Sequence, residues 1–263
     1  LFVNLMEAHL PWIPEPRDLG RFGPPGLDTE GEQLAVLGRY LKAGSATAEE
    51  TIILRDRYDE ALSSLDRSLG RLLEGVANAP RGNETVVVVT SDHGESLGEH
   101  ARFGHRNSLD EEATRIPLIL NGPGLAAGVV RDTPVQLVDV FGYLAQSAGV
   151  ALEPGLDSRD FSERRAVVME HRPGPQGDLP ASYPRGDLSA LVLWPFKYIE
   201  GPHVSSGLFD LEQDPGEQRN LAAQEPEQRK DRQPRDRDRD RVENPGDGPL
   251  FDRAASRHAW SER

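Results

Sequence analysis

Cysteine is absent from this 263-residue chain, and so are long hydrophobic runs. Without cysteine the chain can form neither disulfides nor thiolate metal sites. The sequence therefore does not indicate whether the protein resides in an oxidising or a reducing compartment. No apolar run approaches the roughly 20 residues that a helix needs to cross a bilayer, so no segment is expected to span a membrane. Basic residues are also in the minority. The formal net charge of −14 argues against a nucleic-acid partner, because phosphate binding needs a basic patch.

The stretch TSDHGESLGEHARFGH, residues 90–105, is the most informative part of the chain. It follows a run of four valines, which is typical of a buried strand, and ligands of α/β sheets bind beyond the carboxyl ends of strands. Asp92 and His93 could turn toward one divalent cation there, with Gly94 letting the backbone bend. His105 could bring a second imidazole to the same rim. Taken alone, Asp-His-Gly also fits an ordinary polar turn.

The longer string decides between these readings. TSDHGESLGEH, then FGH, then NSLDEEATRIPLIL resembles the metal-binding segment of the sulfatase family, within the alkaline-phosphatase-like superfamily. The resemblance implies that Asp92 and His93 are metal ligands and that His105 contacts the sulfate. It implies a divalent cation, calcium first, with manganese and magnesium as alternatives. Glu95, Glu99 and His100 are expected to hold the loop.

A second histidine enters through the same resemblance. LFVNL, residues 1–5, predicts a strand, and the following MEAHLPW places His9 before a proline and an aromatic residue. A lone loop histidine is often structural. Here the pattern resembles the substrate-side histidine of sulfatases, which implies that His9 donates a hydrogen bond to the sulfate.

The family pattern is only partly present. Sulfatases use a formylglycine made from a Cys/Ser-x-Pro-x-Arg motif, and the nearest match, residues 182–185, has its arginine one residue too early. The early strand with paired aspartates is also absent. We therefore expect the chain to be the back part of a longer protein, with the formylglycine in the missing N-terminal part. Any signal peptide or anchor would also lie upstream, which favours an extracytoplasmic or membrane-anchored parent over a cytoplasmic one.

Periodicity and capping signals predict the remaining elements. A helix is expected from Thr29 to Lys42, closed by Gly44. Thr47 and Glu50 form a capping box that opens a long helix with an apolar stripe. Ser108 and Glu111 form a second such box, and Thr133 with Pro134 begins a helix that Gly149 closes. The apolar residues of that last helix, among them Phe141 and Leu144, are expected to pack inward. Strands are expected at 1–5, 85–90 and 117–121 in one sheet.

Together these features predict an α/β fold, an alkaline-phosphatase/sulfatase-like sandwich with a small C-terminal antiparallel subdomain. Residues 1–150 would be the back part of the catalytic domain and 151–227 the C-terminal subdomain. Residues 228–263 are low in complexity and rich in both charges, which predicts a disordered tail. Two positions depart from the family: Arg106 replaces a glycine and Asp110 a tyrosine. A left-handed torsion at Arg106 would be strained.

Three functions remain open at this stage. The leading one is a sulfuric ester hydrolase fragment whose full-length parent acts on a sulfate-ester small molecule or glycan. The alternative enzyme is a phosphodiesterase or phosphonate monoester hydrolase of the same superfamily. The third is a catalytically inactive truncated product or binding module. The sequence fixes neither the sulfate ester nor the oligomeric state.

Overall fold

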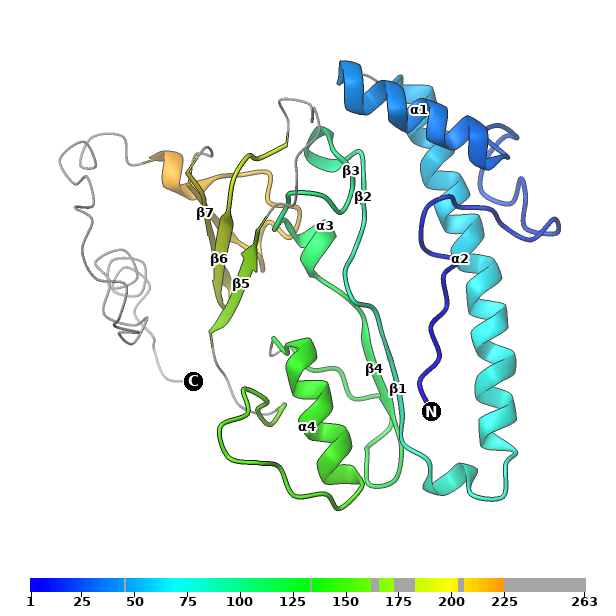
Figure 1. Ribbon diagram of the computed structural model, residues 1–263, viewed down its shortest axis with the longest axis vertical. Coiled ribbons are helices and arrows are strands. Elements are labelled where there is room, and N and C mark those ends of the chain that lie inside the picture. Colours follow the sequence, from blue (N-terminus) through cyan, green and yellow to red (C-terminus); the bar gives the residue numbers. More distant parts are fainter. Residues whose placement is uncertain (45, 133, 162–165, 173–182, 203–205, 225–263) are drawn as a thin grey trace. The chain divides into compact units, whose positions relative to one another are not determined.

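The computed structural model describes residues 1–44, 46–132, 134–161, 166–172, 183–202 and 206–224 (Figure 1). The predicted tail from residue 228, and Thr133, lie outside the described residues. The helices are α1 (Glu30–Ala43), α2 (Ala48–Ala77), α3 (Glu111–Thr114) and α4 (Leu137–Ser147), with 3-10 turns η1 (Gly82–Glu84), η2 (Glu99–Ala101) and η3 (Leu221–Gln224). The strands are β1 (Val87–Thr90), β2 (Ser96–Leu97), β3 (Phe103–Gly104), β4 (Leu118–Asn121), β5 (Val167–His171), β6 (Leu188–Leu193), β7 (Phe196–Glu200) and β8 (Gly207–Asp210).

Local signals correctly predicted the two N-terminal helices. At the start of α2 the Thr47 side chain accepts from the Glu50 N–H, and the Glu50 side chain accepts from the Thr47 N–H. Helix α1 begins after Thr29 with the same reciprocal bonds and ends at Gly44, whose φ of 66° is left-handed. These bonds satisfy amide groups that helix ends otherwise leave unpaired.

The buried face of α2 is more polar than its apolar stripe predicts. Leu54 and Ala61 are fully buried, but so are Arg57 and Glu60, whereas the stripe beyond Leu65 is only half-buried. The Arg57 guanidinium donates to Glu60 at 3.1 Å and to the Asp28 carboxylate at 2.9 Å. The loop before α1 therefore docks on α2 through ion pairs as well as apolar contacts.

Strands β1 and β4 pair antiparallel, with Val87 opposite Asn121 and Thr90 opposite Leu118. Two of the three strands predicted for one sheet thus lie together. The prediction of a strand at residues 1–5 was wrong: these residues form no strand, and Leu1 and Phe2 are almost fully exposed. A strand needs a neighbour to bond its backbone, and none of the described strands pairs with this segment.

The starts of α3 and α4 also differ from the prediction. Asp110 is the residue that precedes α3, while the Ser108 hydroxyl accepts from the Asp110 N–H instead of capping the helix. Helix α4 begins at Leu137, where the Asp139 carboxylate accepts from the Gln136 N–H. It ends as expected near Gly149, whose φ is 71°.

The predicted inward face of α4 is exposed. Four of its apolar residues are 41–60% exposed, namely Leu137, Val138, Phe141 and Leu144. Ile119 on the neighbouring strand β4 is 60% exposed. The helical periodicity was read correctly, but this stripe is largely exposed. The prediction that these residues pack inward was therefore wrong for the described chain.

The small C-terminal sheet was predicted correctly. Strands β5, β6, β7 and β8 form one antiparallel sheet in that order. Leu188, Ala190 and Val192 alternate along β6 and are buried, as expected for a sheet with one covered face. Leu109, just before α3, packs against Leu188 and Ala190 and so joins the sheet to the loop that follows β3.

Candidate functional site

The candidate site starts where β1 ends. The chain turns at Ser91–Glu95, and the Gly94 N–H donates to the Ala113 carbonyl of α3 at 2.9 Å. A Cβ on Gly94 would lie 2.0 Å from the Glu112 carbonyl oxygen, which no real structure tolerates. Gly94 is therefore required because the loop touches α3, and this contact fixes the position of Asp92 and His93.

Asp92 and His93 present a carboxylate and an imidazole to solvent. The Nε2 of His93 lies 3.8 Å from Oδ2 of Asp92, and their side chains are 39% and 87% exposed. The Nδ1 of His93 lies 2.8 Å from the Gly94 carbonyl oxygen. Because a carbonyl only accepts, Nδ1 carries the proton and Nε2 of the neutral ring keeps its lone pair.

The short ribbon of β2 and β3 brings His105 to the same rim. Ser96 pairs with Gly104 and Leu97 with Phe103, so the chain returns directly beside the loop that it left. The His105 ring lies 3.9 Å from the His93 ring between centroids, tilted by 32°. Glu95 hydrogen-bonds Nδ1 of His105 at 3.2 Å, and this bond raises the pKa of His105 above its ordinary value.

His9 reaches the site from a loop far away in the sequence. Its ring centroid lies 6.2 Å from that of His105. The His9 Nδ1 lies 2.6 Å from the Leu10 carbonyl oxygen, so this ring also points its Nε2 elsewhere. Trp12, 1% exposed, anchors the loop: its N–H donates to Gln33 at 2.8 Å and its indole donates to the Ala8 carbonyl at 3.1 Å.

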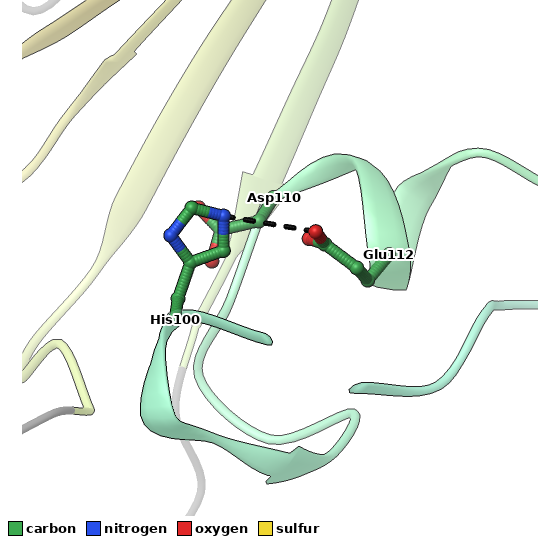
Figure 2. Close-up of side chains that lie close together, drawn as sticks. All are labelled: His100, Asp110 and Glu112. Carbon is green, nitrogen blue, oxygen red and sulfur yellow. Dashed lines mark ion pairs between the residues drawn. The ribbon is translucent and has the colours of Figure 1, made fainter. Parts of the chain in front are cut away.

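Of the three residues expected to hold the loop, Glu99 and His100 tie it to two different helices. Glu99 accepts from the Leu97 N–H at 2.6 Å and from Arg55 at 2.7 Å, which ties the loop to α2. Nε2 of His100 lies 3.6 Å from Glu112 of α3 (Figure 2). Glu95, in contrast, contacts His105 itself.

His100, Asp110 and Glu112 form a second group of metal-ligand types. Their ligand atoms all lie within 4.8 Å of one another, and in the described part of the chain this is the group of three that meets that limit (Figure 2). Asp110, however, is already paired with Arg102 and accepts from Ser108 at 2.7 Å. The group thus carries its own cation, which weakens its case as a metal site. Asp92 and His93 supply only a pair of donors.

The loop after His105 removes the concern about strain at Arg106. Positive φ falls on Asn107, at 46°, and not on Arg106, so Arg106 is not strained. Asn107 is 6% exposed, donates to the Pro184 carbonyl and bonds His171 at 2.9 Å. Tyr183 belongs to the segment whose sequence most resembles the formylglycine motif, and its hydroxyl hydrogen-bonds the Phe103 backbone. These contacts, which the sequence did not reveal, dock the loop on the C-terminal segment.

The profile of the sulfatase family matches residues 3–150, more than half of the chain, and the chain belongs to this family. Arylsulfatase K of Danio rerio is 31% identical over 193 residues, which are 70% of this chain and 37% of that relative. The human arylsulfatase K is 29% identical over 195 residues, which are 70% of this chain and 36% of that relative. The chain thus spans little more than a third of the length of these curated relatives.

Solved structures confirm the α/β fold of the sulfatase and alkaline-phosphatase type. A protein solved in complex with its substrate D-glucosamine-2-N,6-O-disulfate is 22% identical with a TM-score of 0.57, over 73% of this chain and 42% of that one. The phosphonate monoester hydrolase of Agrobacterium radiobacter is 26% identical with a TM-score of 0.53, over 69% of this chain and 39% of that one.

Among the described helices, none combines the length and apolar character that a bilayer crossing requires.

Proposed function

We propose that this chain forms part of a sulfuric ester hydrolase that acts on a sulfate-ester small molecule or glycan. The observation that carries the proposal is the gathering of His9, His93 and His105 beside Asp92. Three segments of a sulfatase-family chain meet there, with imidazoles whose Nδ1 atoms are all held by an acceptor. Their Nε2 atoms remain for a ligand.

Asp92 and His93 are the residues proposed to hold a divalent cation. Membership of the sulfatase family implies such a metal, with calcium proposed first and manganese or magnesium as alternatives. Two donors on one ion, each at roughly 2.1–2.6 Å, lie no more than about 5 Å apart, so the 3.8 Å between Nε2 and Oδ2 fits. When bound, the cation would neutralise charge on the sulfate oxygens. Asp92 contributes one negative charge, and further oxygen ligands must come from elsewhere.

His9 and His105 are proposed to donate hydrogen bonds to the sulfate. With Nδ1 committed to Leu10 or Glu95, each ring donates from Nε2 when it is protonated. The raised pKa of His105 favours that protonated form. Such donors stabilise negative charge as it builds on the transferred group and the leaving oxygen. The formylglycine nucleophile would belong to a part of the parent protein that this sequence does not contain.

A phosphodiesterase or phosphonate monoester hydrolase is the second candidate. The likeness to the Agrobacterium radiobacter enzyme favours it, at 26% identity. The described site fits either candidate, because a cation and hydrogen-bond donors can hold a sulfate or a phosphonate anion alike. The nucleophile separates them: Cys/Ser-x-Pro-x-Arg in the upstream reading frame would establish the sulfatase. A chain without this segment is expected to be an inactive product or binding module.

Calorimetric titration of the chain with calcium, manganese and magnesium tests the metal assignment, alongside an aryl sulfate assay. We expect weak binding and no turnover, because the pair gives two donors whereas calcium takes six or more oxygens. The Asp92→Ala variant should lose the binding, whereas Asp66→Ala, on the exposed face of α2, should keep it. Binding unchanged in Asp92→Ala would refute the metal role, and steady turnover would show that the site is complete.

A further inference from the structure

Glu95 lies directly across the β2–β3 ribbon from His105. In the β2–β3 ribbon Ser96 lies opposite Gly104, so the next residues outward, Glu95 and His105, face each other across the ribbon. Gly104 has a φ of 82°, a conformation that favours glycine, and its Cβ position lies 3.6 Å from Glu95 Oε1. The bend at Gly104 thus directs His105 over the Glu95 carboxylate.

The Glu95 side chain is 7% exposed, which is unusual for a carboxylate that forms no ion pair with a lysine or arginine of the described residues. Its hydrogen bond goes to Nδ1 of His105 at 3.2 Å. The His105 side chain is 36% exposed, so one edge of the ring is buried against Glu95 and the other reaches solvent. Glu99, a neighbouring carboxylate in the same loop, instead contacts Arg55 and the Leu97 backbone.

We propose that Glu95 is a positioning residue: its carboxylate holds Nδ1–H of His105 and thereby presents Nε2 to the bound anion. An imidazole can rotate about its Cβ–Cγ bond and carry its proton on either nitrogen, so a fixed acceptor on Nδ1 settles both. The proposal rests on the proposed function, which makes His105 a sulfate contact. The hydrogen bond itself does not depend on that function.

Two-bond ¹H–¹⁵N spectra of the histidine rings in the full chain test this directly. The His105→Gln variant assigns the signal. At an alkaline pH where the ring is neutral, His105 should carry its proton on Nδ1 in the wild type. In Glu95→Ala the ratio should shift toward the Nε2–H form that predominates in water. Glu95→Gln should restore Nδ1–H, because its amide oxygen also accepts.

Glu99→Gln is the matched control and should leave the His105 signal unchanged. A His105 ring that is mainly Nε2–H in the wild type would overturn the proposal, as would an unchanged ratio in a folded Glu95→Ala protein. If the Glu95→Ala variant fails to fold, the wild-type spectrum alone still tests the proposal, because it shows which nitrogen of His105 carries the proton.

Titration with inorganic sulfate, at a lower pH where the His105 ring carries both protons and Nε2 can donate, separates this proposal from the proposed function. Sulfate should shift the His105 Nε2 signal, and Glu95→Ala should weaken its binding about three- to tenfold. If sulfate leaves His105 unperturbed while the Nδ1–H ratio responds to Glu95, the anion site is wrong and the positioning stands. If the ratio of the two His105 tautomers is the same in the wild type and in Glu95→Ala, the positioning proposal is wrong, whether or not sulfate shifts the His105 signal.

Discussion

Two groups of charged side chains in this molecule differ in burial. At the rim, the side chains of Asp92, His93 and His105 are 87%, 39% and 36% exposed. In the second group Lys197 of β7 is fully buried, and its Nζ lies 2.9 Å from Glu111 and 3.0 Å from Glu217. Glu217 also accepts from the Glu111 N–H at 2.6 Å, at the start of α3.

This difference in burial distinguishes charged groups that are free to bind a ligand from charged groups that hold the fold together. Charges at the rim keep contact with water and can exchange it for a cation or an anion at little cost. The buried lysine has given up its hydration and depends on its two carboxylates, so its removal leaves a buried charge unpaired. Titratable residues of the same kinds thus join α3 to the C-terminal sheet in one place, and in the other they are proposed to bind a ligand.

The largest effect is expected from breaking the buried group. Lys197→Met should lower the free energy of unfolding by about 3–5 kcal/mol, because Glu217 would stay buried without its cation. Urea unfolding measures this. Lys42→Met, at the exposed end of α1, is the control and should stay within about 0.5 kcal/mol of the wild type. Equal stability of the two variants would mean that burial does not distinguish the groups.

Gly94→Ala probes the contact between the rim and α3. The new Cβ would meet the Glu112 carbonyl, so the loop must shift at a cost of about 1–3 kcal/mol. The His93 and His105 ring signals should move with it. Gly31→Ala in α1, where a Cβ meets nothing within 4 Å, should instead stabilise the protein by about 0.5–1 kcal/mol. If the His93 and His105 ring signals do not move in Gly94→Ala, the contact with α3 does not set the positions of the rim residues.

Glu217→Gln tests the buried group through pH. Burial raises the pKa of Glu217 more than Lys197 lowers it. A carboxyl whose pKa is raised on folding contributes stability that is present below its unfolded pKa and is lost as pH rises through the folded pKa. Wild type should therefore lose stability relative to Glu217→Gln as pH rises above about 4.3. Denaturant unfolding at several pH values measures the difference, and a gain with rising pH would contradict it.

The smallest change in stability is expected at the rim. Asp92→Asn removes an exposed charge and should alter the free energy of unfolding by less than about 0.5 kcal/mol. Thermal and urea unfolding without added metal check this, with Asp66→Asn as the control. A large loss would mean that Asp92 is part of the folded core and not a free ligand.

Features that depend on a few neighbouring residues were predictable. The Thr47–Glu50 capping box needs only its own turn, and the end of α1 needs only Gly44. The lack of a strand at residues 1–5 and the exposure of the apolar stripe of α4 were not, because both depend on partners that their own sequence does not specify. Alternation along β7 places Lys197 on one face of the sheet, but nothing local shows that Glu111 and Glu217 meet it.

The candidate site divides in the same way. Asp92 and His93 are adjacent in the chain, and their pairing could be read from it. The contact of His9 with His105 joins residues far apart in sequence, so only the family resemblance pointed to it. Asn107 and Tyr183 were missed, because their partners in the C-terminal segment gave no sequence signal. The metal and substrate roles of the rim residues stay predictions.

Manganese titration followed in histidine ring spectra tests the central claim most directly. The paramagnetic ion broadens nearby signals, and the chain offers two candidate positions, the rim and the group of His100, Asp110 and Glu112. Broadening of His93 and His105 at lower manganese concentrations than His100, abolished by Asp92→Asn, is the predicted result. Broadening of His100 first, with His93 unchanged, would contradict the assignment of the cation to Asp92 and His93.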